Sequence, residues 1–285
     1  MIRIGISGWT YDGWRGTFYP PKLAHSKELG YASKKVSSIE INGTFYSLQS
    51  PKSYSRWFES TPDDFIFSLK ANRYITHFDR LENPEIPMAN FFASGILGLK
   101  EKLGPILWQF PPSFSFEPDK LEHFFKLLPR DQKEASRLAK KTNLSLERTF
   151  IKGSNSPMKH AMEIRNHSFL NPWFIELLRD YGVALVFADS AGEFPYMEDV
   201  TSDFVYIRLH GESELYVSGY DDDSLNVWRE RIIKWHQGTE PDDKLTISEM
   251  TPKKIKRDVY IYFDNDAKVR APFDAIKLME KISNG

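Results

Sequence analysis

Eight short apolar runs, spaced along the whole chain, constrain its fold more than any other feature. Each run has the length of a strand and is rich in Ile, Val, Phe or Tyr, and most are nearly continuous rather than alternating with polar residues. Parallel strands covered on both faces have this pattern. The runs are Ile2–Ser7, Ser38–Asn42, Phe65–Lys70, Pro105–Phe110, Ala161–Arg165, Val183–Asp189, Phe204–His210 and Val259–Asn265. They predict a mainly parallel sheet.

Stretches with helical character separate most of these runs. They are His25–Val36, Tyr54–Glu59, Met88–Lys102, Leu121–Leu128, Pro172–Tyr181, Ser224–His236 and Ala271–Ile282. The chain has 285 residues, close to the roughly 250 of a typical barrel of alternating strands and helices. The alternation therefore favours an α/β fold with a single (β/α)8 TIM-like barrel over an open doubly wound sheet. We predict one domain over residues 1–285.

Three segments depart from simple alternation. Residues 190–203 carry glycine, proline and scattered acids with little helical period, so the sixth helix is predicted to be degenerate or absent. Residues 130–159 are predicted to form an additional, charged helix. Residues 238–257 are predicted to form a surface excursion, and the basic run at its end, residues 253–257, is typical of a solvated face.

The overall composition excludes several classes of protein. With 41% apolar residues and a net charge of −1, the chain has the material for a buried core and is not expected to be disordered. It has no cysteine, which excludes disulfides, thiol nucleophiles, iron–sulfur clusters and cysteine-bound zinc. No apolar run approaches the roughly 20 residues of a membrane helix, and a strand-like run follows Met1 directly, leaving no signal peptide. We expect a cytoplasmic protein with no membrane partner, and its oligomeric state stays open.

Polar residues gather where the predicted strands end. Three runs end on two polar residues separated by an apolar one: Glu40 with Asn42, Glu163 with Arg165, and Arg208 with His210. Four other runs end on Lys70, Gln109, Asp189 and Asn265. In (β/α)8 barrels the loops that follow the strands build the active site, and residues two apart share one face of a strand. We therefore expect these side chains to surround one cavity.

Charges of both signs would meet in that cavity. Its carboxylates are Glu40, Glu163 and Asp189, and its cations are Lys70, Arg165 and Arg208. Buried charges must be paired or hydrogen-bonded, since an isolated one is costly. Two interpretations stay open: the groups tune one another for catalysis, or they form a polar plug that is satisfied within itself and has no catalytic role.

Several ordered motifs carry a family resemblance. They are Ser7-Gly8-Trp9-Thr10-Tyr11, Trp14-Arg15-Gly16 with Phe18-Tyr19-Pro20, Glu40-Ile41-Asn42 with Thr44-Phe45-Tyr46, Thr61-Pro62, Phe67 with Lys70, Ile75-Thr76-His77, Gln109-Phe110-Pro111-Pro112, Glu163-Ile164-Arg165, Arg208-Leu209-His210-Gly211 and Tyr262-Phe263. The chain resembles the YecE-like family, domain of unknown function 72. The resemblance implies a TIM barrel related in shape to sugar isomerases and endonuclease IV, and no established activity. Many members read Phe-Asn-Asn where this chain has Phe263-Asp264-Asn265.

Missing motifs narrow the chemistry. The chain has no G-x-S-x-G elbow, no phosphate-binding P-loop and no G-x-G-x-x-G fingerprint, which argues against a serine hydrolase and nucleotide-driven phosphoryl transfer. Only His210 lies at a strand end, with His77 in the loop after the third run, and the cations Lys70, Arg165 and Arg208 would repel a dication. We predict no metal and no cofactor, although a weak Mg²⁺ or Mn²⁺ site stays open.

The reaction classes that remain after these exclusions are acid–base and electrostatic catalysis. The candidate catalytic residues are Glu40, Lys70, Glu163, Asp189 and His210, with Glu40 as the preferred base. The candidate substrate-binding residues are Trp9, Asn42, Tyr46, His77, Gln109, Arg165, Arg208 and Asn265. The lysine and arginines suit a phosphate or carboxylate, and the rings of Trp9 and Tyr46 could stack on a sugar or a base. Trp14, Phe18 and Tyr19 are instead expected to pack the first loop.

Three functions follow as hypotheses. The first is an enzyme, an isomerase, lyase or hydrolase, that acts on a small anionic, sugar-like ligand. The second is a nucleic-acid binding or processing protein, against which a net charge near zero argues in part. The third is a binding module without catalysis.

Overall fold

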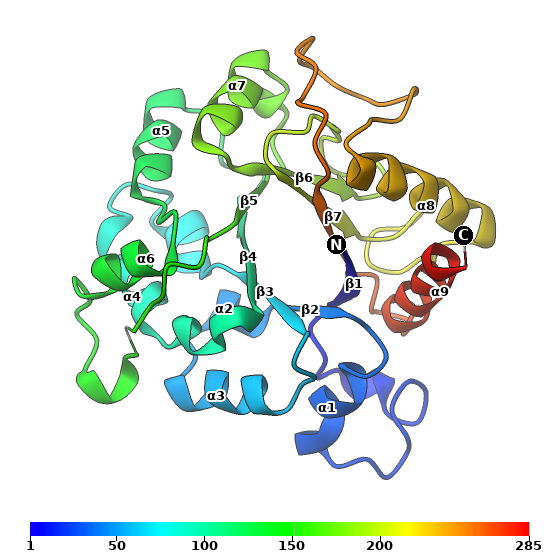
Figure 1. The fold of residues 1–285 in the computed structure, drawn as a ribbon, viewed down its shortest axis with the longest axis horizontal. Coiled ribbons are helices and arrows are strands. Elements are labelled where there is room, and N and C mark those ends of the chain that lie inside the picture. Colours follow the sequence, from blue (N-terminus) through cyan, green and yellow to red (C-terminus); the bar gives the residue numbers. More distant parts are fainter. Residues whose placement is uncertain (151, 285) are drawn as a thin grey trace. The chain divides into compact units, whose positions relative to one another are not determined.

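The computed structural model describes residues 1–150 and 152–284, and its eight strands form a closed barrel in sequence order (Figure 1). The strands are β1 Ile2–Ser7, β2 Ser38–Ile41, β3 Ile66–Lys70, β4 Leu103–Gln109, β5 His160–Glu163, β6 Ala184–Asp189, β7 Phe204–Leu209 and β8 Asp258–Phe263. Each coincides with one of the predicted apolar runs. The predicted (β/α)8 TIM-like fold is thereby confirmed.

Each stretch that was predicted to be helical contains a helix, although the end of Met88–Lys102 is a 3₁₀ segment, Ile96–Lys102, and α2 lies in no predicted stretch. The helices are α1 Glu28–Ala32, α2 Gly43–Tyr46, α3 Pro51–Glu59, α4 Glu85–Ala93, α5 Pro118–Leu127, α6 Gln132–Ala139, α7 Pro172–Tyr181, α8 Asp222–Gln237 and α9 Ala271–Ser283. Residues 190–203, all of which the structure describes, contain no helix, so the degenerate sixth helix is confirmed. The described residues of the range 130–159 form α6 and one 3₁₀ turn, Leu146–Arg148, instead of the long helix that was predicted. Ile151 and Gly285, the last residue of the predicted domain, lie outside the described residues.

Local sequence explains where the helices begin and end. At α7, the Asn171 side chain accepts a hydrogen bond from the Trp173 N–H at 3.0 Å, and Pro172 follows at the first helical position. Gly182 ends the helix at a φ of 65°, a conformation in which a side chain would be strained. Asp221 caps α8 by accepting from the Ser224 N–H at 2.8 Å. No helix formed by the described residues is long and apolar enough to cross a membrane.

The chain divides into two compact units. The first comprises Met1–Glu40 and the chain from Phe169 onward. Within it β1 pairs in parallel with β2 and β8, β7 pairs with β6 and β8, and α8 and α9 pack together beside β8 (Figure 1). A Cβ atom on Gly5 would lie 1.9 Å from the Ser38 carbonyl oxygen, so only glycine permits this strand spacing. One domain over residues 1–285 stays a prediction.

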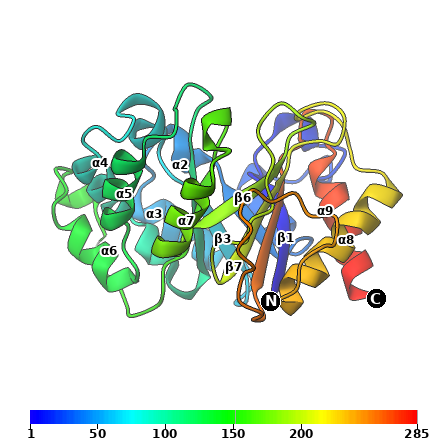
Figure 2. The same cartoon turned by 90° about the horizontal axis from the view of Figure 1, so that it is seen from above.

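The second unit comprises Ile41–Ser168. Its strands β3, β4 and β5 pair in parallel, with a register shift between Phe67 and Leu69. Pro105 lies opposite this shift, where its lack of an N–H interrupts the ladder of backbone hydrogen bonds. The Pro105 carbonyl oxygen accepts a hydrogen bond from the Ser68 hydroxyl at 2.8 Å. Helices α4 and α6 lie beside one another (Figure 2).

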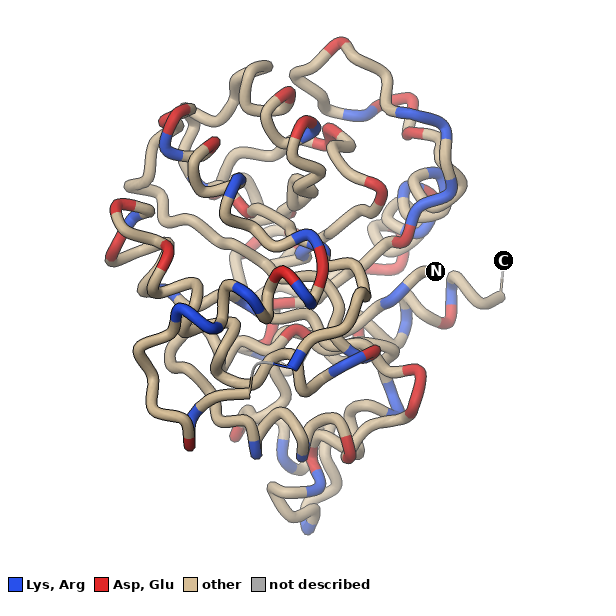
Figure 3. Tube along the Cα trace, turned by 60° about the vertical axis from the view of Figure 1, so that its left-hand side comes forward, with Lys and Arg blue, Asp and Glu red and all other residues tan. Residues whose placement is uncertain are grey.

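Residues 238–257 contain neither helix nor strand, yet the first unit holds them through two adjacent acids. Glu198 accepts from the Leu245 N–H at 3.0 Å, and Asp199 accepts from the N–H groups of Ile247 and Ser248 at 2.9 and 3.0 Å. The lysines of the basic run are exposed, as predicted, whereas Arg257 is buried. Its guanidinium donates to backbone carbonyls within the run, which explains the difference. Elsewhere charged residues of both signs are spread along the chain (Figure 3).

Candidate functional site

Glu40, at the end of β2, is the centre of a buried polar cluster in the first unit. Its Oε1 accepts from Ser7 Oγ and Arg208 Nη2, both at 2.8 Å. Its Oε2 accepts from the Tyr206 hydroxyl at 2.6 Å and Arg208 Nε at 3.2 Å. Glu40 and Arg208 have no exposed surface. Four donors therefore engage both oxygens of the residue that the sequence suggested as a general base.

Asp264, directly after β8, extends this cluster. Its Oδ2 lies 2.8 Å from Arg208 Nη2 and 3.1 Å from His210 Nδ1. The His210 ring is buried, with its edge against Tyr216 at a centroid distance of 5.3 Å. Two carboxylates, Glu40 and Asp264, thus hold the single guanidinium of Arg208, which fixes its orientation.

Asp266 adds a titrating group to the first unit. Burial, followed by the negative charge of Asp264, raises the pKa of Asp266 to about 6, although Tyr11 opposes the shift through a hydrogen bond. A carboxyl group in this range exchanges protons close to neutral pH. We call Ser7, Glu40, Tyr206, Arg208, His210, Asp264 and Asp266 the first cluster.

Asp189 and Asn265 have other partners in the same unit. Asp189 accepts from the Tyr220 hydroxyl at 2.9 Å, and burial raises the pKa of this carboxyl group. The Asn265 amide donates to the Ser218 carbonyl and to Asp274, both at 2.9 Å. Asn265 therefore supports the loop after β7 through its nitrogen, while within the described residues its buried Oδ1 has no hydrogen-bond partner.

The aromatic residues of the first loop pack on one another. Trp14, Phe18 and Tyr19 are buried, and their rings lie 4.9 to 6.1 Å apart, which agrees with the packing role expected for them. Trp9 is half-buried, and its backbone carbonyl accepts from the Tyr19 hydroxyl at 2.6 Å. The loop thus holds the backbone of Trp9 in place.

The second unit contains a cluster that is rich in cations, formed by Lys70, Arg73, His77, Glu163 and Arg165. The pKa of His77 is lowered to about 4, first by burial and then by the positive charges of Lys70, Arg165 and Arg73, while Glu163 opposes them. Arg165 Nε donates to Glu163 Oε1 at 2.8 Å, and this carboxylate is fully buried. We call these five residues the second cluster. Three cations against one carboxylate leave it with net positive charge.

Two short helical segments position this cluster. Lys70 ends β3, and its Nζ lies 4.3 Å from the centre of the Phe45 ring on α2. The segment Tyr74–Phe78 is a single π-helical turn, in which the Asp79 N–H donates to the Tyr74 carbonyl at 2.7 Å. It places His77 with its ring edge against Phe45, at 5.0 Å. Such turns occur frequently at functional sites.

Three further predicted residues lie in the second unit. Gln109 is buried at the end of β4, in register with Glu163 on β5. Asn42 precedes α2, and within the described residues its buried Oδ1 has no hydrogen-bond partner. Tyr46 is 64% exposed, so its ring is open to a ligand.

Sequence reasoning missed Asp264 and Asp266. Asp264 lies inside the predicted run Val259–Asn265 but one residue before the selected Asn265, and therefore on the other face of a strand; Asp266 follows that run directly. The only sequence signal was the aspartate at 264, where many members of the resembling family carry asparagine. Ser7 and Tyr206, which donate to Glu40, gave no signal, because a serine and a tyrosine in a strand are ordinary. Among the described residues, no group of three or more His, Asp or Glu side chains is arranged to hold a metal ion.

Comparisons with known proteins agree with the fold. The chain is 26% identical over 284 residues to the UPF0759 protein YunF of Bacillus subtilis, covering 94% of this chain and 89% of that protein. It is 25% identical over 250 residues to the UPF0759 protein YecE of Escherichia coli, covering 85% and 84%.

Solved structures give the same result. A DUF72 family protein of Thermotoga maritima superimposes with a TM-score of 0.74 at 26% identity, covering 99% of both chains. One of Enterococcus faecalis has a TM-score of 0.70 at 17% identity, covering 99% of this chain and 96% of that chain. The family model described as "Protein of unknown function DUF72" matches residues 3–285. The chain therefore belongs to the DUF72 family, as its motifs predict.

Proposed function

We propose that the protein binds a small anionic ligand, one that carries a phosphate or a carboxylate, at the second cluster. The observation that supports this is the charge around His77. Lys70, Arg165 and Arg73 all act on its ring, and Glu163 is the opposing charge. An anion entering this region would relieve repulsion among the three cations.

The side chains suit such a ligand. Glu163 orients Arg165, so the guanidinium loses less conformational entropy when the ligand binds. Lys70 supplies a point charge, and each charge-assisted hydrogen bond to the anion contributes about 1.5–3 kcal/mol. With a pKa of about 4, His77 is neutral at pH 7 and serves as a hydrogen-bonding group rather than a fourth cation.

Acid–base chemistry is the reaction class that the first cluster supports. Asp266, with a pKa of about 6, can both donate and accept a proton near neutral pH. Glu40 is engaged by four donors, so we assign it the role of positioning Arg208. Proton transfer of this kind fits an isomerase, a lyase or a hydrolase.

Calorimetric titration with inorganic phosphate tests the anion site. The wild type is expected to bind at low ionic strength, and Lys70→Ala or Arg165→Ala to weaken binding about tenfold, as the loss of one charged contact predicts. Lys52→Ala removes an exposed lysine of α3 and is the matched control. The absence of binding at millimolar phosphate, or equal weakening by all three variants, would contradict the proposal.

A second candidate function is binding of single-stranded nucleic acid. Its specific support is Arg73, whose guanidinium carbon lies 5.3 Å from the centres of the Tyr46 and Phe78 rings, both more than 60% exposed. Exposed rings beside cations suit stacked bases and a phosphate backbone. Fluorescence anisotropy of a labelled oligonucleotide, repeated over a series of salt concentrations, tests it. Weak binding that Tyr46→Ala leaves unchanged would eliminate this candidate.

A further inference from the structure

A cavity of about 510 Å³ lies in the first unit, lined by residues outside both clusters. Its walls come from the end of β6, the helix-free segment 190–203, helix α8 and the excursion 238–257. The volume is within the range of roughly 300–1,000 Å³ that small-molecule sites occupy. Of the lining residues, the strand-end pattern selects Asp189, and none belongs to the proposed anion site.

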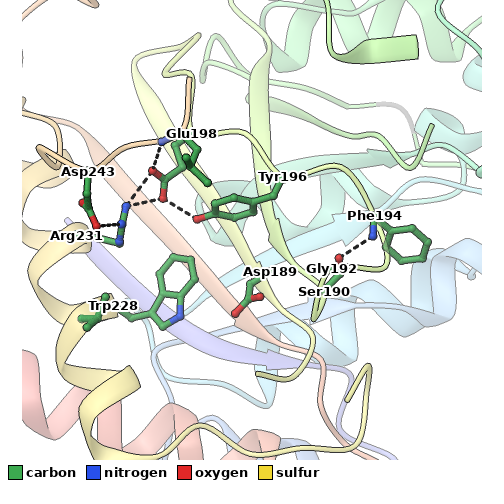
Figure 4. A pocket seen from close by; sticks show the side chains of 11 residues that line it. Asp189, Ser190, Gly192, Phe194, Tyr196, Glu198, Trp228, Arg231 and Asp243 are labelled. Atoms are coloured by element: carbon green, nitrogen blue, oxygen red, sulfur yellow. Dashed lines mark hydrogen bonds and ion pairs between the residues drawn. The ribbon is translucent and has the colours of Figure 1, made fainter. Parts of the chain in front are cut away.

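Aromatic side chains form much of the lining. Phe194, Tyr196 and Trp228 all line the cavity; in Figure 4 the Tyr196 and Trp228 rings lie on the side of Glu198 and Asp189, and the Phe194 ring lies farther out, beyond Ser190. Trp228 is buried, while Phe194 and Tyr196 are half-buried. These faces can pack against an apolar body, and their π-electrons attract a cation.

The charges of the lining are unequal. Glu198 and Asp243 share Arg231, whose Nη1 lies 2.7 and 2.9 Å from the two Glu198 oxygens and whose Nη2 lies 2.6 Å from Asp243 (Figure 4). Tyr196 also donates to Glu198 at 2.6 Å. Arg231, the one lysine or arginine among the described lining residues, is therefore already paired with two carboxylates.

Asp189 is the third carboxylate of the cavity lining, besides Glu198 and Asp243. It lines the cavity together with Trp228 and Tyr196 (Figure 4) and accepts from the Tyr220 hydroxyl. In the part of the chain that the structure describes, no lysine or arginine lies within ion-pair distance of it. The Ala191 N–H also donates to this half-buried carboxylate, and His210 is the basic residue that acts on it. A ligand cation would supply the full ion pair that these groups do not.

We propose that this cavity binds an organic cation: an amine attached to an aromatic or apolar body, with the ammonium facing Asp189 and the body against Trp228. An anionic ligand is disfavoured, because it would meet Asp189 and Glu198. The proposal does not depend on the anion site of the second cluster.

Calorimetric titrations with three probes of similar size test the charge requirement on the wild-type protein. The probes are 2-phenylethylamine, 2-phenylethanol and 3-phenylpropionate. We expect the amine to bind at least about tenfold more tightly than the other two, the ratio that one ion pair of about 1.4 kcal/mol gives. Equal affinities for the amine and the alcohol, or no binding of the amine at about 10 mM, would overturn the proposal without any variant.

Variants locate the site. Asp189→Asn should weaken the amine about tenfold and leave phosphate affinity unchanged, whereas Asp180→Asn, at an exposed carboxylate on α7, should alter neither. Trp228→Leu should weaken the amine several-fold, because the ring that packs against the body of the ligand is lost. Unaltered amine binding by folded Asp189→Asn would overturn the assignment. Because phosphate is measured in parallel, failure of this proposal and failure of the anion site are distinguishable.

Discussion

The two clusters arise from the same sequence pattern but differ in charge and burial. In the first, Glu40 and Asp264 hold Arg208 in a network whose central members have no exposed surface. In the second, three cations act on a half-buried histidine against one carboxylate. Carboxylates that enclose a buried guanidinium fix its orientation, whereas an excess of cations over carboxylates attracts an anionic ligand. The comparison thus assigns positioning to the first cluster's arginine and ligand binding to the second cluster's cations.

The clusters also respond to pH in opposite directions. Asp266 is an acid whose pKa is raised from 3.8 to about 6, so the folded state holds more protons than the unfolded chain between these values. His77 is a base whose pKa is lowered from 6.5 to about 4, so there the unfolded chain holds more protons. Stability therefore falls with rising pH in the first case and rises with pH in the second.

The largest expected difference between the clusters is in stability. Glu40→Ala leaves Arg208 buried with one fewer carboxylate and should lower the free energy of unfolding by about 3–5 kcal/mol. Lys70→Ala removes one of several like charges, so it should cost about 1 kcal/mol or less. Urea denaturation at pH 7 measures both. Equal losses would mean that the second cluster is as interdependent as the first.

A single donor within the first cluster should have a smaller effect. Tyr206→Phe removes a hydroxyl that donates to the charged Glu40, and the expected loss of stability is about 1.5–3 kcal/mol. Tyr262→Phe is the matched control, because its hydroxyl pairs with the neutral hydroxyl of Ser38 at 2.7 Å, and about 0.5–1.5 kcal/mol is expected. The same denaturation assay applies. A larger loss for Tyr262→Phe would reverse the assigned importance of Glu40.

Asp266→Asn should increase stability at neutral pH. Ionising the buried Asp266 carboxyl beside Asp264 lowers the free energy of unfolding, and the substitution removes this penalty. The penalty is fully present above pH 6 and absent below about pH 3.8. We expect a gain of about 1–2 kcal/mol at pH 7, allowing for partial exposure to solvent, and little change at pH 3.5. Thermal unfolding over this pH range is the measurement. A variant less stable than wild type at pH 7 would contradict the raised pKa.

His77→Gln should have the smallest effect and the opposite pH profile. As the pH falls from 6.5 to about 4, His77 takes up a proton in the unfolded chain but not in the folded protein, and this lowers the free energy of unfolding. The variant lacks this titration, so it should lose less stability on acidification, by about 1 kcal/mol. His160 has a similarly lowered pKa, about 4, and remains in the variant, so part of the slope persists. A slope identical to wild type would show that His77 does not titrate abnormally.

The sequence allowed the barrel to be predicted because buried parallel strands are continuous apolar runs, and the eight runs coincide with the strands. It also allowed Glu40, Lys70, Glu163 and Arg208 to be selected, because polar residues in such strands stand out. It could not reveal which acid pairs with which base. Asp264 lies 56 residues from Arg208 along the chain, and only the folded backbone brings them to 2.8 Å.

The excursion 238–257 is a second example of what the sequence could not reveal. Its composition is that of a surface loop, and the acids that hold it, Glu198 and Asp199, lie in a segment without helical pattern. Neither segment has a periodicity from which their contact could be inferred. For the same reason the cavity beside Asp189 was not predicted, since its wall consists of these irregular segments.

The π-helical turn at Tyr74–Phe78 makes the second cluster sensitive to chain length. A π-turn contains about one residue more than an α-turn, so deletion of one residue would let the segment relax to the commoner form. The side chains of this segment that follow the deleted residue would then rotate by about 100° around the helix axis. His77 would leave its place against Phe45 although no residue type in the cluster had changed. Insertions and deletions, rather than substitutions, are therefore a direct route by which relatives of this protein could gain or lose the site.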